Sequence, residues 1–223
     1  MKRIIAAMLI ATVAMTSVCA RSKKDAKKTQ KTVMHSVNLS FPFAFQSWNV
    51  DTKTSLLGKI EGDTNFAGVT FNWNMLTVYD NRFTMIWGGG IGYTKASLEE
   101  KFGDTDLDGI HLTGKFGAGF APLNTEAMTL AFHGFMGINA RPISGSANDV
   151  DYSVAPVGLA LGADVFYVYR ISPKFGLNVG LDLSFDIIGS GTYKIEAGNN
   201  KYEYDLGYTS FNLEPRIGAC LII

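Results

Sequence analysis

The sequence predicts an all-β fold: an eight-stranded antiparallel up-and-down transmembrane β-barrel, preceded by a cleaved signal peptide. Eight segments alternate large apolar residues with small or polar ones, which is the period of a β-strand. The connections between these segments alternate between short and long. The composition, with 24 Gly, 15 Phe and 9 Tyr but only 18% charged residues, favours pleated strands and turns over helices with many surface charges.

The first twenty residues have the three parts of a secretory signal peptide. Lys2 and Arg3 give a positive start, an apolar stretch follows, and a small-residue ending precedes the expected cleavage after Ala20. The apolar stretch has about twelve residues, whereas a membrane-spanning helix needs roughly twenty, which disfavours a retained anchor. Lipidation of Cys19 is the alternative to cleavage after Ala20, and it is disfavoured because Val18 stands where a small residue is expected.

The residues that follow form the one charge cluster of the chain. The run 21–31 (RSKKDAKKTQK) has the composition of a disordered, solvated linker. We therefore expect a signal peptide over 1–20, a basic linker over 21–33 and an outer-membrane β-barrel domain over 34–223. Lys and Arg together number 20, as do Asp and Glu, so nothing in the charge indicates a nucleic-acid partner. Cleavage would leave Cys220 as the sole cysteine, which excludes an intramolecular disulfide.

Each predicted strand places large apolar side chains on one face and small or polar ones on the other. In the first, Leu39, Phe41 and Phe43 alternate with small or polar residues. Phe135 is an exception, an apolar residue on a small, polar face. Each segment is long enough for a tilted span, which needs roughly nine to eleven residues. The segments are 37–46, 67–75, 83–94, 110–120, 128–139, 157–167, 175–185 and 211–223.

The composition of the two faces predicts which one points outward. A soluble barrel hides its large apolar residues inside, but here the other face consists of Gly, Ala, Ser, Thr and Asn with a few charges, a poor apolar core. A bulky face in lipid and a small polar face around a narrow lumen account for both. Closure of the barrel also pairs the backbone groups, as hydrocarbon requires. The glycine run 88–92 lacks phosphate-binding spacing and fits a crowded lumen.

The connections divide into short turns and long loops, as in barrels whose termini are both periplasmic. The short ones contain turn signals at 80–81, 122–124 and 172–174, and the long ones cover 47–65, 95–109, 141–153 and 189–207. In the last long connection, TYKIE and KYEYD flank a turn, which predicts a hairpin exposed above the membrane. We expect it to offer an edge or aromatic contacts to a partner. Its exposed residues are predicted to be Tyr193, Ile195, Tyr202 and Tyr204.

Charged and imidazole side chains on the inward face predict a structural polar network. Charges in a tight interior must be paired, because an isolated buried ion is costly. We expect the two cations to neutralise the three carboxylates, so that changing Arg216 to Met should lower the unfolding temperature. The predicted members are His111, Lys115, His133, Asp164, Asp182, Glu214 and Arg216.

No catalytic, metal-binding or cofactor-binding residue is predicted. The three histidines form no metal-binding pattern. An acyl hydrolase of this fold would need a membrane-facing histidine beside a serine, whereas alternation turns His111 and His133 inward and His35 precedes the first predicted strand. We therefore expect a protein that is not an enzyme.

The signal peptide, the eight two-faced segments and the loop asymmetry together resemble the small eight-stranded bacterial outer-membrane barrel families of OmpX, OmpW and the OmpA transmembrane domain. The likeness covers about 34–223 and rests on pattern. One departure is the ending Cys220-Leu221-Ile222-Ile223, because such barrels usually finish with an aromatic residue. The resemblance implies an outer-membrane location with both termini periplasmic. It also implies outer-membrane lipid, the barrel insertion machinery during assembly and a host or matrix ligand as partners.

The function expected from these features is non-enzymatic. We expect a barrel that anchors the envelope or presents surface loops for adhesion or partner binding. A narrow conduit for small apolar molecules, implied by the resemblance to OmpW, is the main alternative. A secreted soluble barrel that binds lipid is the third.

Overall fold

A computed structural model of the chain describes residues 31–51, 59–98, 105–147 and 150–223. These residues form strands and the turns between them, within one compact unit, Lys31–Ile223. No helix in this described part is long and apolar enough to span a membrane. The strands are β1 (Lys31–Ser40), β2 (Phe43–Asp51), β3 (Lys59–Tyr79), β4 (Phe83–Leu98), β5 (Thr105–Asn124), β6 (Met128–Ala140), β7 (Ile143–Ala147), β8 (Val150–Ser172), β9 (Phe175–Ala197) and β10 (Asn200–Ile222).

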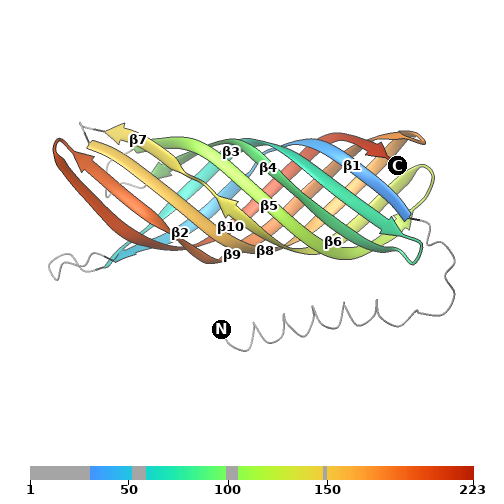
Figure 1. Cartoon of the computed structure of the whole chain (residues 1–223), viewed down its shortest axis with the longest axis horizontal. Coiled ribbons are helices and arrows are strands. Elements are labelled where there is room, and N and C mark those ends of the chain that lie inside the picture. The colour runs from blue at the N-terminus through green and yellow to red at the C-terminus, as the bar shows by residue number, and fades with distance from the viewer. Residues whose placement is uncertain (1–30, 52–58, 99–104, 148–149) are drawn as a thin grey trace, which may run out of the picture. The chain divides into compact units, whose positions relative to one another are not determined.

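The strands close into an antiparallel ring of eight (Figure 1). β1 and β2 lie end to end between β10 and β3, so together they act as one strand. β6 and β7 likewise lie end to end between β5 and β8. With each pair counted once, every strand has a neighbour on both sides, which confirms the predicted eight-stranded barrel.

Each of the two breaks falls at a proline, and the residue before that proline faces a second proline on the next strand. The Phe41 N–H donates to the Pro215 carbonyl at 2.9 Å, and the Arg141 N–H donates to the Pro156 carbonyl at 3.0 Å. Proline has no N–H, so the return hydrogen bond of each pair cannot form. The register continues unchanged on the far side, so the breaks do not alter which residues face inward.

The number of strands and their stagger together set the width of the barrel. Following the paired residues once around the ring from Ser36 leads back to the same broken strand at Gln46, ten residues further on. Eight strands with a stagger of this size are strongly tilted and leave an interior that side chains can fill.

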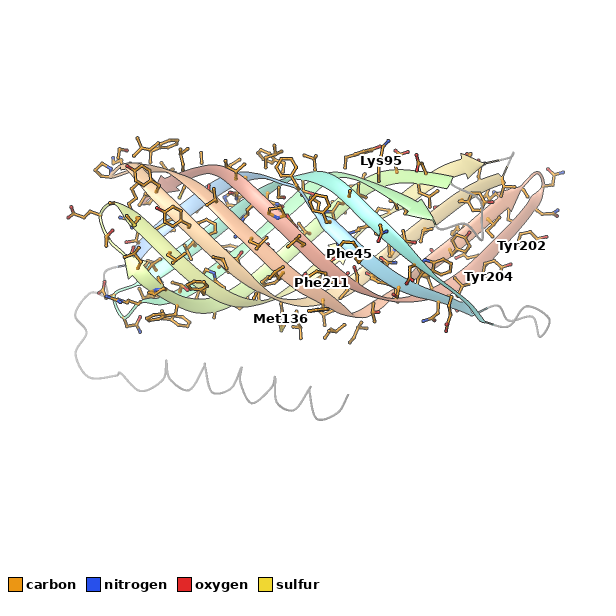
Figure 2. The ribbon with its side chains drawn as sticks, turned by 180° about the vertical axis from the view of Figure 1, so that it is seen from behind. Phe45, Lys95, Met136, Tyr202, Tyr204 and Phe211 are labelled. Atoms are coloured by element: carbon orange, nitrogen blue, oxygen red, sulfur yellow. The ribbon has the colours of Figure 1, made fainter. Side chains whose placement is uncertain are left out.

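The outward face is the large apolar one, as predicted. Phe71, Phe116 and Ile217 are each more than half exposed, while their inward-facing neighbours Thr70 and Arg216 are buried. Figure 2 shows side chains of this kind, among them Phe45, Met136 and Phe211, standing away from the ribbon. We call these outward residues the apolar band; a surface of this kind suits contact with hydrocarbon.

The interior has three layers, only the middle of which has the predicted small and polar character. The barrel has a short-turn end, with turns at 80–82, 125–127 and 173–174 and the C-terminus, and a hairpin end, where β9 turns into β10 (Figure 1). At the short-turn end, inward-facing apolar side chains fill the lumen. This set, called the inner plug, comprises Met34, Leu76, Val78, Ile86, Ala121, Ala131, Phe166, Val168, Cys220 and Ile222.

The strands run further than the sequence predicted. β1 begins at Lys31, so the last three residues of the predicted linker belong to the barrel, while the signal peptide and 21–30 lie outside the described residues. β5 continues to Asn124, so the turn lies at 125–127 and not at the predicted 122–124. Most of each predicted long loop is strand. The reason is that the extended strands bury apolar side chains against one another at the hairpin end.

Candidate functional site

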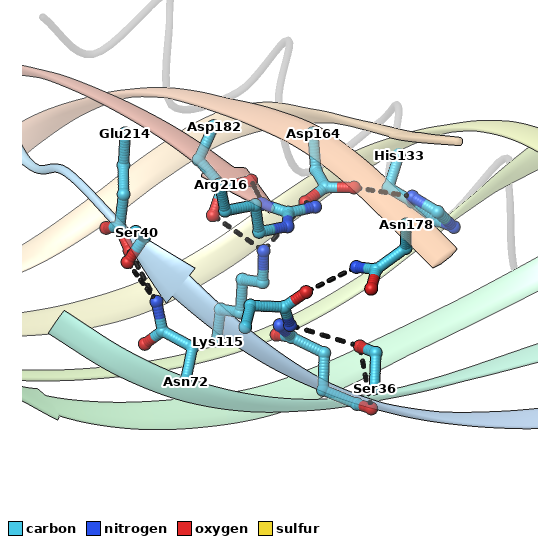
Figure 3. A network of polar contacts seen from close by, with 12 residues as sticks. Ser36, Ser40, Asn72, Lys115, His133, Asp164, Asn178, Asp182, Glu214 and Arg216 are labelled. Atoms are coloured by element: carbon cyan, nitrogen blue, oxygen red, sulfur yellow. Dashed lines mark hydrogen bonds and ion pairs between the residues drawn. The ribbon is translucent and has the colours of Figure 1, made fainter. Parts of the chain in front are cut away.

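Two cations and two carboxylates lie together in the middle layer (Figure 3). Lys115 Nζ is 2.7 Å from Asp164 Oδ2 and 2.6 Å from Asp182 Oδ2. The Arg216 guanidinium bridges the same two carboxylates. His133 Nδ1 lies 3.1 Å from Asp164 Oδ1. Five consecutive strands of the ring, β5, β6, β8, β9 and β10, each contribute one of these predicted network residues, and the charges of the two cations and two carboxylates balance.

The other two predicted members lie elsewhere in the layer. Glu214 Oε1 accepts hydrogen bonds from Ser40 Oγ at 2.6 Å and from Asn72 Nδ2 at 2.7 Å. His111 Nδ1 lies 3.1 Å from Thr70 Oγ1. The expected pairing of Glu214 with Lys115 and Arg216 is therefore replaced by hydrogen bonds to a hydroxyl and an amide. Ser40 lies on β1, which pairs with the strand of Glu214, so its short side chain reaches the Glu214 carboxylate directly.

A second charged pair, which the sequence did not single out, lies closer to the hairpin end. Arg141 NH2 donates to Asn212 Oδ1 at 2.6 Å, and NH1 lies 3.5 Å from Asp186 Oδ2. Asn139 also donates to Asp186, at 2.8 Å. The Arg141 guanidinium lies 5.5 Å from the centre of the Phe66 ring. Continued alternation from His133 to Asn139 and from Asp182 to Ser184 places Arg141 and Asp186 on the inward face, but Arg141 falls within a predicted long connection.

The inner plug and the charge network together fill the lumen from the short-turn end to the middle layer. Phe166 is completely buried, and the Arg216 guanidinium lies 5.3 Å from its ring centre, so the two layers are in contact. On the hairpin side of the network, a polar cavity extends as far as Arg141. Among the described residues, no group of three His, Cys, Asp or Glu side chains could hold a metal ion.

A second cavity opens at the hairpin end, and its lining is almost entirely apolar. It contains about 370 Å³ of empty space, including its open mouth. The Trp48 Nε1–H donates to Thr64 Oγ1 at 2.9 Å, which fixes the indole against the wall. Gly62 leaves room for this ring, since a side chain there would overlap it. This apolar cup is lined by Gln46, Trp48, Val50, Thr64, Phe66, Ile143, Val154, Tyr193 and Leu206.

The apolar cup lies beyond the apolar band. Phe45 and Phe211, stacked at 6.4 Å, are outward residues near the upper edge of the band. Beyond them along the same strands, the outward positions carry hydroxyls and charges; for example, Ser47 Oγ donates to Asp63 at 2.6 Å. The exposed charged residues of this outer region include Glu61, Asp63, Lys95, Asp106, Asp108, Asp151, Lys194, Lys201, Glu203 and Asp205.

The predicted hairpin is present, but its side chains lie differently from the prediction. Tyr193 is only 6% exposed and lines the apolar cup, so its predicted exposure is wrong. Tyr204 stacks with it at 6.5 Å, and both Tyr204 and Ile195 pack against the cup residues. Tyr202 is half exposed, and Figure 2 shows it at the hairpin end.

A bulge in β9 explains this arrangement. Ile187 and Ile188 are consecutive, yet both are exposed, and the register with β8 and β10 shifts around them. The extra residue reverses the alternation. From Gly189 onward the odd-numbered residues face inward, so Tyr193 points into the barrel. The sequence places Tyr193 in a predicted long loop, and this placement gives no sign that its side chain points into the barrel.

Comparison with known proteins supports the fold. No family model matches the sequence, and no curated protein sequence matches it. The crystal structure of the outer membrane protein OprG from Pseudomonas aeruginosa is similar with a TM-score of 0.59 and 9% identity, over 87% of this chain and 97% of that one. The outer membrane protein AlkL gives 0.49 and 13%, over 91% and 94%, and Ail of Yersinia pestis gives 0.42 and 16%, over 83% and 98%. The likeness to OprG confirms the predicted fold, that of the small bacterial outer-membrane β-barrels.

Proposed function

We propose that this protein is a non-enzymatic outer-membrane barrel that binds small apolar molecules in the apolar cup. The sealed lower barrel anchors it in the bilayer, with both termini on the periplasmic side and the cup at the cell surface. Lipid surrounds the apolar band, and the insertion machinery assembles the barrel. The charged outer face around the cup is the surface offered to a host or matrix partner.

The observation that carries this proposal is an apolar cavity outside the apolar band. Its almost entirely apolar lining and its open mouth are features of sites that take small apolar molecules. Apolar surface transferred from water into such a cavity contributes roughly 25 cal/mol per Å². Because the walls are strands joined on both sides, the cavity is largely formed before a ligand arrives.

The filled lumen argues against a conduit along the barrel axis. A solute would have to displace both cations from Asp164 and Asp182 and then pass the buried ring of Phe166. Separating a buried ion pair leaves uncompensated charges and costs about 3–5 kcal/mol. The exposed apolar band likewise argues against a secreted soluble barrel, because large apolar surfaces of this extent are hidden in soluble proteins.

The positions of the histidines support a role other than lipid hydrolysis. His111 and His133 are buried in the lumen, as expected. His35 lies inside β1 rather than before it, where it stacks on Trp73 at 5.8 Å. Its cross-strand partners are Met75 and Leu221, so the described contacts of this histidine include no serine nucleophile.

Fluorescence and conductance together test the proposal. The sequence has three tryptophans, so changing Trp73 and Trp87 to Phe leaves Trp48 as the single tryptophan. A brominated eight-carbon alkane should quench its fluorescence saturably in bilayer nanodiscs, because Trp48 lines the cup. Val154→Phe should abolish the saturable component by filling the cup. Reproducible conductance steps in planar bilayers, or quenching that Val154→Phe leaves unchanged, would overturn the proposal.

A further inference from the structure

The wall of the apolar cup includes an amide side chain whose bonding is incomplete. Gln46 lines the cup and is 4% exposed, and its Oε1 is buried without a hydrogen-bond partner among the described residues. A buried acceptor without a hydrogen bond is energetically unfavourable, because it has lost its bonds to water. Such a group, in the wall of an otherwise apolar cavity, provides a bonding site for a ligand.

The residues beside Gln46 are bonded elsewhere. Its register partners are Ser210 and Thr64. Ser210 Oγ donates to Asn212 at 3.0 Å, and Thr64 accepts from Trp48. The register partners of Gln46 therefore leave its Oε1 atom able to accept a hydrogen bond from a ligand.

The lining of the apolar cup carries no charge. Its polar members are Gln46, Thr64, Trp48 and Tyr193. Burial first, and then the neighbouring Tyr152 hydroxyl, raise the pKa of Tyr193, so this hydroxyl stays neutral. The nearest described cation toward the lumen is Arg141, which lies against Phe66 and is bonded to Asp186 and Asn212.

We infer that the apolar cup selects an apolar chain bearing one uncharged hydrogen-bonding group, such as an aliphatic alcohol, and that Gln46 binds this group. The inference rests on the proposed function and specifies its ligand class. A hydroxyl can both donate and accept, so it matches either orientation of the amide. A plain alkane leaves Gln46 unbonded, and a carboxylate would be buried without a cation.

Three probes with the same chain and quencher test this inference. We would titrate 8-bromo-1-octanol, 1-bromooctane and 8-bromooctanoate into the Trp48-only protein in nanodiscs. Saturable quenching should show the alcohol binding about tenfold more tightly than either of the others, since one hydrogen bond contributes about 1.4 kcal/mol here. This comparison needs no variant at position 46.

Gln46→Leu provides the matched test, because it replaces the amide with an apolar group of similar size. The alcohol should lose its advantage, while 1-bromooctane should bind as well as or better than before. Asn65→Leu, an exposed substitution on β3, should leave the order unchanged. A heated against unheated detergent gel checks that each variant is folded.

The possible outcomes separate this inference from the proposed function. Equal binding of all three probes, or tightest binding of the carboxylate, would overturn the role of Gln46 while leaving the cup as a ligand site. If no probe quenches Trp48 saturably, both the ligand class and the proposed function are wrong.

Discussion

At the scale of single residues, the charge network is the feature that the sequence predicts best. Alternation alone places Lys115, Asp164, Asp182 and Arg216 on the inward face, and a narrow barrel then leaves them few partners except one another. The individual pairs do not follow from the alternation. Which carboxylate meets which cation depends on the stagger between strands, and that stagger moves Glu214 toward Ser40 instead.

Arg216→Met should destabilise the barrel. Both carboxylates that the guanidinium bridges would lose a partner while remaining buried, at a cost of about 3–5 kcal/mol. The temperature at which the protein changes mobility on detergent gels should fall. Lys95→Met, which removes an exposed charge outside the lumen, is the control. An equal unfolding temperature for the two variants would contradict a stabilising network.

Two glycine substitutions examine the same site without removing a charge. A Cβ at Gly180 would come within 2.7 Å of the Arg216 guanidinium, so Gly180→Ala must displace it. A Cβ at Gly114 would meet nothing within 4 Å, so Gly114→Ala is a matched control. We expect the first variant to unfold at a lower temperature than the second.

Gln46 and Arg141 show why the remaining site residues could not be predicted. Gln46 belongs to the inward face of the first predicted strand, where it looks like any other small or polar residue of the lumen. Its significance depends on the cavity around it, which six strands build together. Arg141 directly precedes Pro142, and a proline is ordinarily a signal for the end of a strand.

At the scale of strands, the sequence gives the number and the faces correctly but not the lengths. Alternation of large and small residues is clear within the apolar band, because lipid and lumen are such different surroundings. Beyond the band, water replaces lipid and the outward residues become polar, so β9 and β10 read as loop. The bulge at Ile187 and Ile188 hides their inward face further.

Shortening the β9–β10 hairpin should remove ligand binding in the apolar cup while leaving the barrel folded. Deleting residues 191–206 and joining Ser190 to Gly207 through an Asn-Gly turn removes Tyr193 and Leu206 from the cup. The strands within the apolar band keep their partners, so the shift in mobility between heated and unheated samples should persist. Saturable quenching of Trp48 should disappear. A shortened chain that no longer forms a heat-modifiable barrel would show instead that the hairpin is needed for folding.

At the scale of the whole molecule, the barrel has an apolar lumen at each end and a polar layer between them. The alternation is less clear at the strand ends, because inward-facing residues such as Leu76 and Val78 are apolar there as well. The sequence consequently predicts a lumen that is polar throughout. The inner plug explains how a barrel with a charged middle layer can be closed at the short-turn end.

The assignment of the two faces can be tested directly with a lipid-soluble carbene probe. Irradiation in bilayers should modify outward residues such as Trp87, Phe116 and Met136, which are each about half exposed. Phe166 and Leu76 are completely buried in the inner plug, so they should be labelled only after unfolding in denaturant. Mass spectrometry of the fragments measures both sets in one sample, with the unfolded protein as the control for intrinsic reactivity. Labelling of Phe166 at the level of Phe116 in the folded protein would mean that the faces are inverted, and the anchor, the seal and the cup would then all have to be assigned anew.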